Sequence, residues 1–588
     1  MKIKDLMMKT LTPIAAAMLA VLSANTFADN NRAILFQVGG GNMATTDQSD
    51  GTVHDNLIVQ AQIGTSNDSD ASQTSGTNNS VTTHVQLGES NFIISGQQSN
   101  TSLSRISVYQ TGSMNMAGPG QSETTTSSIL INQTGSMNMA ATAQNMATLS
   151  NAVSNQIGFM NVGVIGQTET TASSALVNQA GSMNVSVIGQ IETTGSSALF
   201  NQAGSTNMGV IGQGNATATI ALINQAGSMN SAGVSQSMVT GSGALVNQAG
   251  EMNDGEISQV LVTASSALVN QIGSMNVADI EQENVTALSF AAINQAGEMN
   301  EADIEQDGAI ANAAIINQAG SMNEAFIGQE GAPVLSIAVI NQIGELNEAD
   351  IDYDGGVVLS AAFINQAGEM NEADIEQEDV TGSTAIINQA GSMNEADIDQ
   401  DGAIASVSII NQAGSMNGAD IEQEDEPVLS IAIVNQIGEM NEAEIEYDDG
   451  VVLSAAFINQ AGELNDAFIE QDDAIASVAI INQAGSMNDA DIEQEGGPVV
   501  ASIAFINQIG EMNEAEILQL DGTALSAANI NQVGSMNMAE VTQMGAALSI
   551  ASTTQLGSSN MHTTTQTGTG QTAIVVQIGS GNMGMITQ

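Results

Sequence analysis

Small, aliphatic and amide residues alternate with other residues in short segments along this chain. Within residues 289–306 they occupy every second position of two segments: Ser289, Ala291, Ile293 and Gln295 in the first, and Asn300, Ala302, Ile304 and Gln306 in the second. A period of two is typical of a β-strand with one buried face. The linking residues 296–299 read Ala-Gly-Glu-Met, which predicts a turn in which Gly297 supplies permissive backbone. The pattern therefore predicts strand, turn and strand, and it excludes a helix because apolar residues do not recur three and four positions apart.

The same unit recurs along the chain. The pattern Q-x-G-x-x-N-x5-Q begins 24 times between Gln37 and Gln577, and its 23 intervals average about 23.5 residues. A Ser usually stands six residues before the opening Gln, and Tyr353 and Tyr447 replace the closing Gln in two copies. A fixed period of this length indicates stacked repeats. We therefore predict an all-β fold, a β-solenoid of about 24 strand-turn-strand rungs.

A single rung is not stable alone, and stacking supplies the missing backbone hydrogen bonds. Parallel rungs about 4.8 Å apart pair every backbone group with the rungs above and below, and inward amides can bond to their copies along the axis. We expect Ile and Ala to form a thin dry core between two layers. The residues predicted to form the stacked columns are Ser104, Gln110, Gly112, Asn115, Gln121, Ser173, Gln179, Gly181, Asn184, Gln190, Ser289, Gln295, Gly297, Asn300, Gln306, Ser360, Gln366, Gly368, Asn371 and Gln377.

Composition restricts the function. The chain has 588 residues with a formal net charge of −59, and it contains no Cys. Nucleic acid is excluded as a partner because no basic patch could neutralise phosphates. Of the 64 acidic residues, 52 lie within residues 251–521, a range without Lys or Arg. We therefore divide the chain into near-neutral repeats at 29–250, strongly acidic repeats at 251–521 and near-neutral repeats at 522–588.

The first residues predict export. Residues 1–28 begin with Lys2, Lys4 and Lys9, continue with an apolar run and end in small residues at Ala28. This layout is typical of a secretory signal peptide, and the run is too short to span a bilayer. No later apolar stretch has the length of a transmembrane segment, so we expect a secreted protein without one.

The five fixed residue types of the repeat, S-x5-Q-x-G-x-x-N-x5-Q, resemble the curlin repeat of curli fibre subunits, the functional amyloids of Gram-negative bacterial surfaces. The sets beginning at Ser104 and Ser173 match it at every key position. The resemblance implies an extracellular homopolymer in biofilm and cell adhesion, with a nucleator subunit and an outer-membrane secretion pore as partners. This chain differs by having many more repeats and many more acids.

The first and last repeats are nearly free of acid, unlike the middle of the chain. A rung without a neighbour exposes a row of unpaired N–H and C=O groups, which can template another chain. We expect neutral ends to meet without the repulsion that acidic rungs would suffer. The residues of these predicted elongation ends are Gln37, Asn42, Gln48, Gln577, Asn582 and Gln588.

Two acidic stretches resemble the first half of a calcium loop. Both read D-x-D-x-D-G, and their acids are Asp350, Asp352 and Asp354 in one and Asp397, Asp399 and Asp401 in the other. The bidentate Glu expected at the twelfth position is Ala361 or Ser408, so the prediction is at most weak Ca²⁺ binding by the acidic array, with a solvated acidic face as the simpler reading. We predict no required cofactor. The leading alternative function is a non-polymerising acidic surface solenoid that binds divalent cations.

We predict no enzyme activity. A glycosidase would need one distinguished pair of carboxylates, and these acids recur without one. His54, His84 and His562 lie in the least acidic parts, and we expect them to be exposed rather than ligands. The outward positions of the first strand, such as Ile337 and Phe363, are apolar beside an Asn column, which favours lateral association or surface adhesion.

Overall fold

The structure, a computed structural model, describes residues 30–49, 52–283, 288–308, 311–331, 335–352, 355–356, 358–378, 380–402, 404–423, 429–446, 453–471, 475–494, 501–520 and 522–588. In these ranges the regular structure consists of strands, and no segment forms a helix. The described residues accordingly include no helix of the length and hydrophobicity needed to cross a membrane. The predicted signal peptide, residues 1–28, lies outside the described residues. The all-β prediction is confirmed.

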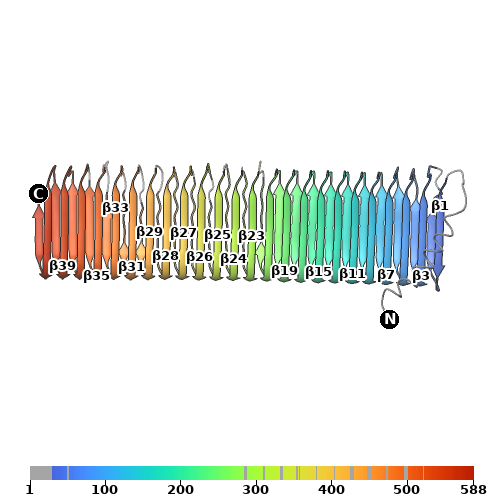
Figure 1. Ribbon diagram of the computed structural model, residues 1–588, viewed down its shortest axis with the longest axis horizontal. Helices are drawn as coiled ribbons and strands as arrows, with labels where there is room; N and C mark the ends of the chain where they lie inside the picture. The colour runs from blue at the N-terminus through green and yellow to red at the C-terminus, as the bar shows by residue number, and fades with distance from the viewer. Residues whose placement is uncertain are drawn as a thin grey trace, which may run out of the picture. The chain divides into compact units, whose positions relative to one another are not determined.

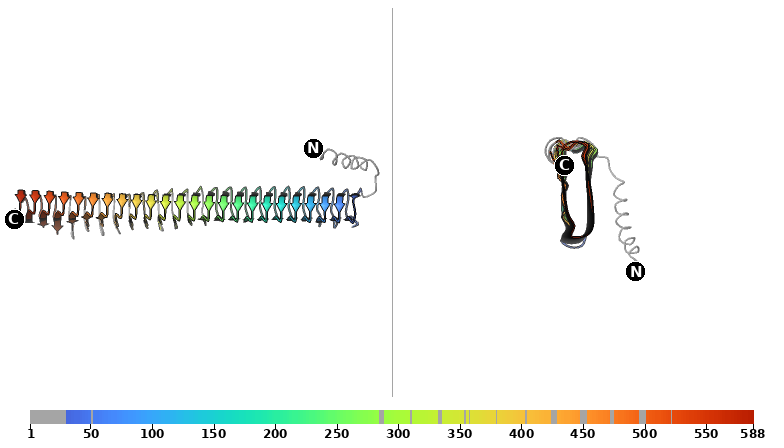
Figure 2. Two further views of the ribbon diagram at one scale, coloured as in Figure 1. Left: turned by 90° about the horizontal axis from the view of Figure 1, so that it is seen from below. Right: turned by 90° about the vertical axis from the view of Figure 1, so that its left-hand side faces the viewer.

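The chain divides into two compact units, Met1–Met252 and Asn253–Gln588. Each unit is a β-solenoid in which the strands of successive repeats stack side by side, parallel and in chain order (Figure 1). The division lies beside residue 251, where the acid-rich repeats begin. Seen end-on, the first and second segments of a repeat form two facing layers joined by turns (Figure 2).

In the first unit both segments of each repeat are strands. The first segments form one parallel sheet: β1 (Arg32–Val38), β3 (Leu57–Thr65), β5 (Val81–Glu89), β7 (Arg105–Ser113), β9 (Ser128–Ser136), β11 (Asn151–Phe159), β13 (Ser174–Ser182), β15 (Ser197–Ser205), β17 (Ile220–Ser228) and β19 (Gly243–Glu251). The second segments form the facing sheet: β2 (Met43–Asp47), β4 (Asp68–Gln73), β6 (Phe92–Gln98), β8 (Met116–Ser122), β10 (Met139–Asn145), β12 (Val162–Thr168), β14 (Val185–Ile191), β16 (Met208–Gly214) and β18 (Ser231–Ser237).

In the second unit the first segments again form one parallel sheet: β21 (Ser266–Ser274), β23 (Phe290–Glu298), β24 (Ala313–Ser321), β25 (Ile337–Glu345), β26 (Ala361–Glu369), β27 (Thr384–Ser392), β28 (Val407–Ser415), β29 (Ile431–Glu439), β31 (Ala455–Glu463), β33 (Val478–Ser486), β35 (Ile503–Glu511), β37 (Ala527–Ser535), β39 (Ile550–Ser558) and β41 (Thr572–Ser580). The second segments form a short pair and a seven-stranded sheet: β20 (Asp254–Val260) with β22 (Val277–Ala278), and β30 (Glu442–Ala443), β32 (Asp466–Ala467), β34 (Asp489–Glu493), β36 (Glu514–Leu520), β38 (Met538–Met544), β40 (Met561–Thr567) and β42 (Met583–Thr587).

The core lies between the two layers and has the predicted composition. In the repeat that contains β26, Ala362 and Ile364 of the first segment and Ala373 and Ile375 of the second are all buried. One Ala and one aliphatic residue from each segment fill most rungs, so the core is thin and its stability comes from repetition. Phe200 is the largest fully buried side chain among the described residues.

The turn after the first segment brings neighbouring rungs into very close contact. Gly368 has φ of +139°, and a Cβ added to it would stand 1.7 Å from the carbonyl oxygen of Gly391 in the next rung. The same approach recurs at the equivalent glycine of nearly every repeat. Glycine is therefore required here for space as well as for its backbone conformation.

One prediction fails in the acidic repeats. The sequence predicts a strand at Asn300–Gln306, but the described residues 301–306 form no strand, and neither do 324–329, 348–352, 371–377, 394–400 and 417–423. The first backbone bond of the segment survives, since Glu301 N–H donates to the carbonyl of Asn323 at 2.9 Å. Beyond it the Asp303 carboxylate accepts the following amide, that of Ile304, at 2.7 Å. Acids stack at most outward positions of these segments, and a local bond of this kind competes with the ladder.

Candidate functional site

The opening glutamines form an inward amide column. In the second unit Gln342 Nε2 donates to Gln366 Oε1 at 3.0 Å, and Gln366 Nε2 donates to Gln389 Oε1 at 2.9 Å. Each Nε2 also donates within its own rung, as from Gln366 to the carbonyl of Asn371 at 3.0 Å. In the first unit Gln110 and Gln179 occupy the same kind of column. The predicted amide ladder at this position is confirmed.

The Asn column ties the turns together. Asn371 Nδ2 donates to Asn347 Oδ1 at 2.9 Å and to the carbonyl of Gly391 at 3.2 Å, while the Asn371 amide donates to the same Oδ1 at 3.3 Å. Each Asn thus bonds to the rungs on both sides. Asn115, Asn184 and Asn300 lie in the same arrangement, buried as predicted.

The Ser and closing Gln columns are continuous in the near-neutral repeats of both units and interrupted in the acidic ones. Gln121 donates to Gln144 at 2.8 Å and Gln190 to Gln213 at 2.7 Å. In the acidic repeats neither amide atom of Gln306 has a partner, and Gln377 bonds only through its oxygen, to Gln400. The buried hydroxyls of Ser104 and Ser173 are bonded, whereas those of Ser289 and Ser360 have no partner.

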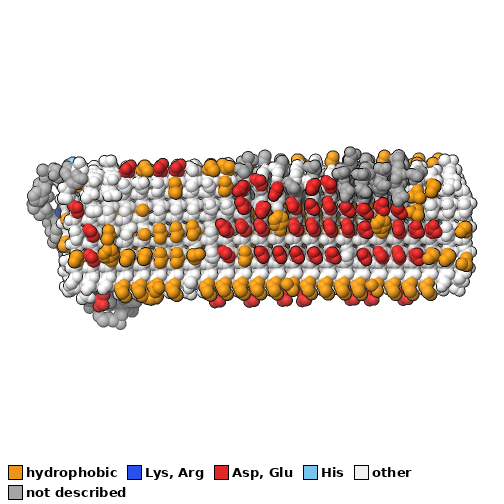
Figure 3. Space-filling model, turned by 180° about the vertical axis from the view of Figure 1, so that it is seen from behind, with side chains coloured by type: hydrophobic (Ala, Val, Ile, Leu, Met, Phe, Trp, Pro, Cys, Tyr) orange, Lys and Arg blue, Asp and Glu red, His pale blue; other side chains and the backbone are white. Residues whose placement is uncertain are grey.

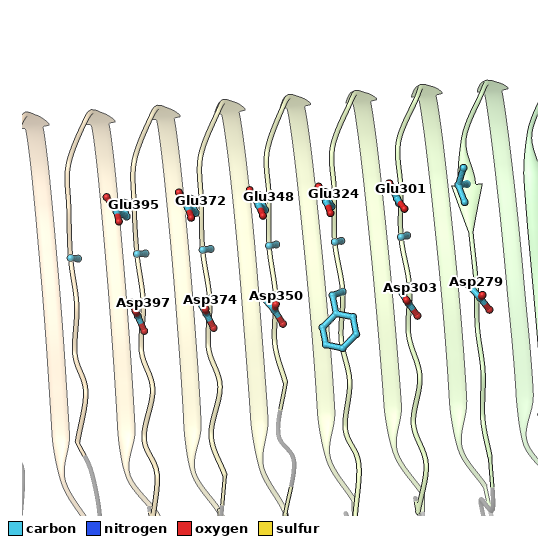
Figure 4. A pocket seen from close by; sticks show the side chains of 18 of the residues that line it. Asp279, Glu301, Asp303, Glu324, Glu348, Asp350, Glu372, Asp374, Glu395 and Asp397 are labelled. Atoms are coloured by element: carbon cyan, nitrogen blue, oxygen red, sulfur yellow. The ribbon is translucent and has the colours of Figure 1, made fainter.

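The acids of the second unit form long outward columns. Figure 3 shows them as rows on one face, and Figure 4 shows the Glu and Asp columns in close-up. They line a shallow groove of about 490 Å³. Its acidic lining residues are Asp279, Glu301, Asp303, Glu324, Glu348, Asp350, Glu372, Asp374, Glu395, Asp397 and Asp420. We call this surface the acidic face.

Five carboxylates of the acidic face have a pKa raised above the ordinary value, mainly by burial: Asp279, Glu348, Asp350, Asp397 and Asp420. Burial raises the pKa of Asp397 to about 6, and the neighbouring charges of Asp374 and Asp420 add to the rise. Burial also raises the pKa of Asp491 to about 6, with Glu516 as the largest charge contribution. Like charges about 5 Å apart repel by roughly 1 kcal/mol even in water. The groups with a raised pKa can therefore take up protons at a higher pH than isolated carboxylates do.

The two predicted calcium stretches do not form a loop in the described residues. Asp350 and Asp352 lie at successive outward positions of an extended segment, and Asp354 lies outside the described residues. Asp397 lies at an equivalent outward position, but Asp399 has a φ of +28°, and the Asp401 amide donates to Asp399 Oδ1 at 3.3 Å. The described part of the chain contains no group of three His, Asp or Glu side chains arranged to hold a metal ion. Weak Ca²⁺ binding stays a prediction.

The predicted elongation ends continue the columns of their neighbours. At the first repeat, Gln37 donates to Gln62 and Gln48 to Gln73, both at 2.6 Å, and Asn42 accepts from Asn67 at 3.2 Å. At the last repeat, three further bonds link the rungs: Gln555 donates to Gln577 at 2.9 Å, Asn582 to Asn560 at 2.7 Å and Gln566 to Gln588 at 3.4 Å.

The expectation for two histidines is wrong. His84 and His562 are buried, and only His54 is exposed. His84 Nδ1 bonds to the Ser69 hydroxyl at 2.8 Å, and burial lowers the pKa of His84 to about 3. Both rings stand at inward positions of the period-two pattern, in β5 and β40, so that pattern already indicates that they are buried. They are neutral core residues rather than ligands.

No protein-family model matches the chain, and no curated protein matches it.

Proposed function

We propose that this chain is a structural subunit that polymerises by stacking of rungs into extracellular fibres of the curli type, with roles in biofilm matrix and adhesion. A β-solenoid of this regularity is consistent with a structural repeat protein. The observation that carries the proposal is the opening Gln column, in which each rung bonds to the next through identical groups. An interaction that joins rungs within one chain can equally join rungs of two chains.

The terminal strands supply the surfaces for such joining. Among the described residues, β1 pairs on one side with β3, and β41 pairs on one side with β39. In this proposal a further strand pairs with the N–H and C=O groups along the other edge of each of these strands. No acid lies within β1 or β41, and Arg32 of β1 is the one charged residue of the two strands, so we propose that these acid-free edges are the elongation surfaces.

In this proposal the mature chain acts outside the cell after removal of residues 1–28. The resemblance to curli subunits supports a nucleator and an outer-membrane pore as partners. A structural rather than catalytic role is supported by the acids themselves, which recur in columns with no pair set apart from the others (Figure 4).

The proposal is tested with the purified mature chain. We expect unbranched fibres by electron microscopy, thioflavin fluorescence that rises with time, and the cross-β spacing of about 4.8 Å in fibre diffraction. The measurement is made with chelator and with millimolar Ca²⁺. Monomers under both conditions would refute polymerisation. Monomers that bind Ca²⁺ would support the alternative, an acidic solenoid that binds divalent cations without polymerising, which stays a prediction.

A further inference from the structure

The outward side of the first-segment sheet in the second unit differs in charge from the acidic face. From β23 to β37 the first seven positions of every strand of this sheet carry no charged residue. Acids occur only at the last strand position, as at Glu369, where the strand enters the turn. We call the outward side of these strands the apolar face.

The polar column of this face satisfies its own hydrogen bonds. Asn341 Nδ2 donates to Asn365 Oδ1 at 2.8 Å, Asn365 to Asn388 at 2.9 Å and Asn388 to Asn411 at 2.8 Å. Because these amides bond along the axis, covering the column breaks none of these bonds. The face can therefore become dry without a large desolvation penalty, as in the interfaces of stacked sheets.

The apolar face is also not flat. Ile343 and Ile437 are exposed by 63% and 64%, and between them lie three consecutive rungs with Ala at the same position. These isoleucines bound a groove of about 480 Å³ whose floor includes Ala367, Ala390 and Ala413. The surface is therefore a series of aliphatic ridges and shallow hollows, which a matching surface could fill.

Charge and area identify the occupant. A chain with a net charge of −59 repels its own copies through most surfaces, but not through an uncharged face. Pairing through this face keeps both acidic faces on the outside, away from each other. A nine-residue strand at about 3.3 Å per residue and 4.8 Å per rung presents roughly 140 Å², so about six rungs reach the ~800 Å² per partner of a stable interface.

We propose that the apolar face is the lateral interface on which a second copy of this chain docks, sheet against sheet, with the Ile343 and Ile437 ridges and the alanine groove at its centre. The pairing is independent of axial stacking, because it uses the outward side of the sheet rather than its edges. The acids at the strand ends form the charged rim that such interfaces have.

The test adds one charge at the same rung in two places. Ala390→Asp places a carboxylate on the exposed groove floor, and Met393→Asp places it on the exposed turn, where φ of +56° suits Asp. The paired double variant Ile343→Thr with Ile437→Thr removes the ridges while keeping β-branched residues. Mass per unit length of fibres is measured by scanning transmission electron microscopy, and sedimentation mass is measured if no fibres form.

We expect the wild type and Met393→Asp to show twice the mass of Ala390→Asp, and the double Thr variant to need a higher protein concentration to pair. Equal mass in the wild type and Ala390→Asp, at the single-chain value, would overturn the proposal. Equal loss in both Asp variants would also overturn it, because the effect would then be one of total charge. If no fibres form, the proposed function fails, but the sedimentation mass still tests whether two chains pair through the apolar face.

Discussion

The glycine of each turn allows a direct test of the rung-to-rung geometry. We expect Gly368→Ala to destabilise the rungs around it strongly, because the new Cβ would stand 1.7 Å from the carbonyl oxygen of Gly391. Gly382 is the matched control. It also has a positive φ, of +72°, but a Cβ there would meet nothing within 4 Å.

The two costs can be estimated separately. Placing Ala at the left-handed φ of Gly382 costs about 1–2 kcal/mol. At Gly368 the φ of +139° lies further from any conformation that Ala adopts readily, and such a residue costs about 1–3 kcal/mol. Moving the Gly391 carbonyl away also breaks its bond from Asn371 Nδ2, worth about 1 kcal/mol, and the displaced backbone adds to this. The sum for Gly368→Ala is about 3–5 kcal/mol.

Hydrogen exchange is the suitable assay, because a solenoid opens locally and need not melt as one unit. The backbone amide of Asn394, which donates to Asn371 Oδ1, reports on the rung beside the substitution. We expect its protection to fall by about 100-fold or more in Gly368→Ala and by about 30-fold or less in Gly382→Ala, at 1.36 kcal/mol per tenfold change. Equal protection losses in the two variants would refute the close approach as the reason for glycine.

Three further outcomes are expected. Gln366→Ala should cost about 1–3 kcal/mol of local stability by hydrogen exchange because it interrupts the buried amide column, while Glu369→Ala at the exposed turn should be nearly neutral, and equal effects would contradict the inward assignment. Burial raises the pKa of Asp397 and Asp491 to about 6, so the folded state binds their protons more tightly than the unfolded state does. The stability that these two groups contribute is therefore fully present below about pH 4 and is lost as the pH rises through 6. A melting temperature that is flat from about pH 4 to 7 would contradict this. Appending an acidic rung, residues 360–377, at the C-terminal end should slow fibre elongation at low salt in a seeded thioflavin assay, and an unchanged rate would reject neutral ends as elongation surfaces.

The period of two was sufficient to predict the fold and its inward columns. Gln366 and Asn371 are buried where the alternation places them, and their ladders have the predicted partners along the axis. The same rule, applied without regard to residue type, would also have placed His84 among the core residues, since it occupies an inward position of β5. A neutral imidazole ring can be buried when it has a hydrogen-bond partner, which for His84 is the Ser69 hydroxyl.

Other features depend on distances between rungs, which a linear pattern does not contain. The sequence shows that Gly368 recurs, but not that its α-carbon lies against the carbonyl of Gly391. Likewise the sequence contains isoleucine at 343 and 437, but their exposure and the groove between them exist only once the rungs that carry alanine are stacked.

Aspartate at one outward position contributes to the loss of the second ladder, together with the charge of the stacked segments. The outward position that follows the first Ala is Asp in residues such as Asp303 and Asp374, whose carboxylates accept the next amide at 2.7 and 2.6 Å, and no strand forms there. Glu256 and Glu516 occupy the same position in β20 and β36, which keep seven-residue strands. Residue type is not the whole cause, because Glu444 follows the two-residue β30 and the segment with Phe326 at this position forms no strand. Aspartate is one methylene shorter, so its oxygen reaches the neighbouring amide that a ladder would otherwise use. Asp491 in β34 fits between the two groups, since it stays in a five-residue strand and its buried Oδ1 has no partner. The second layer of the acidic repeats is therefore weakened by local hydrogen bonding and by repulsion together, while the first layer, with its continuous amide columns, holds these rungs in register.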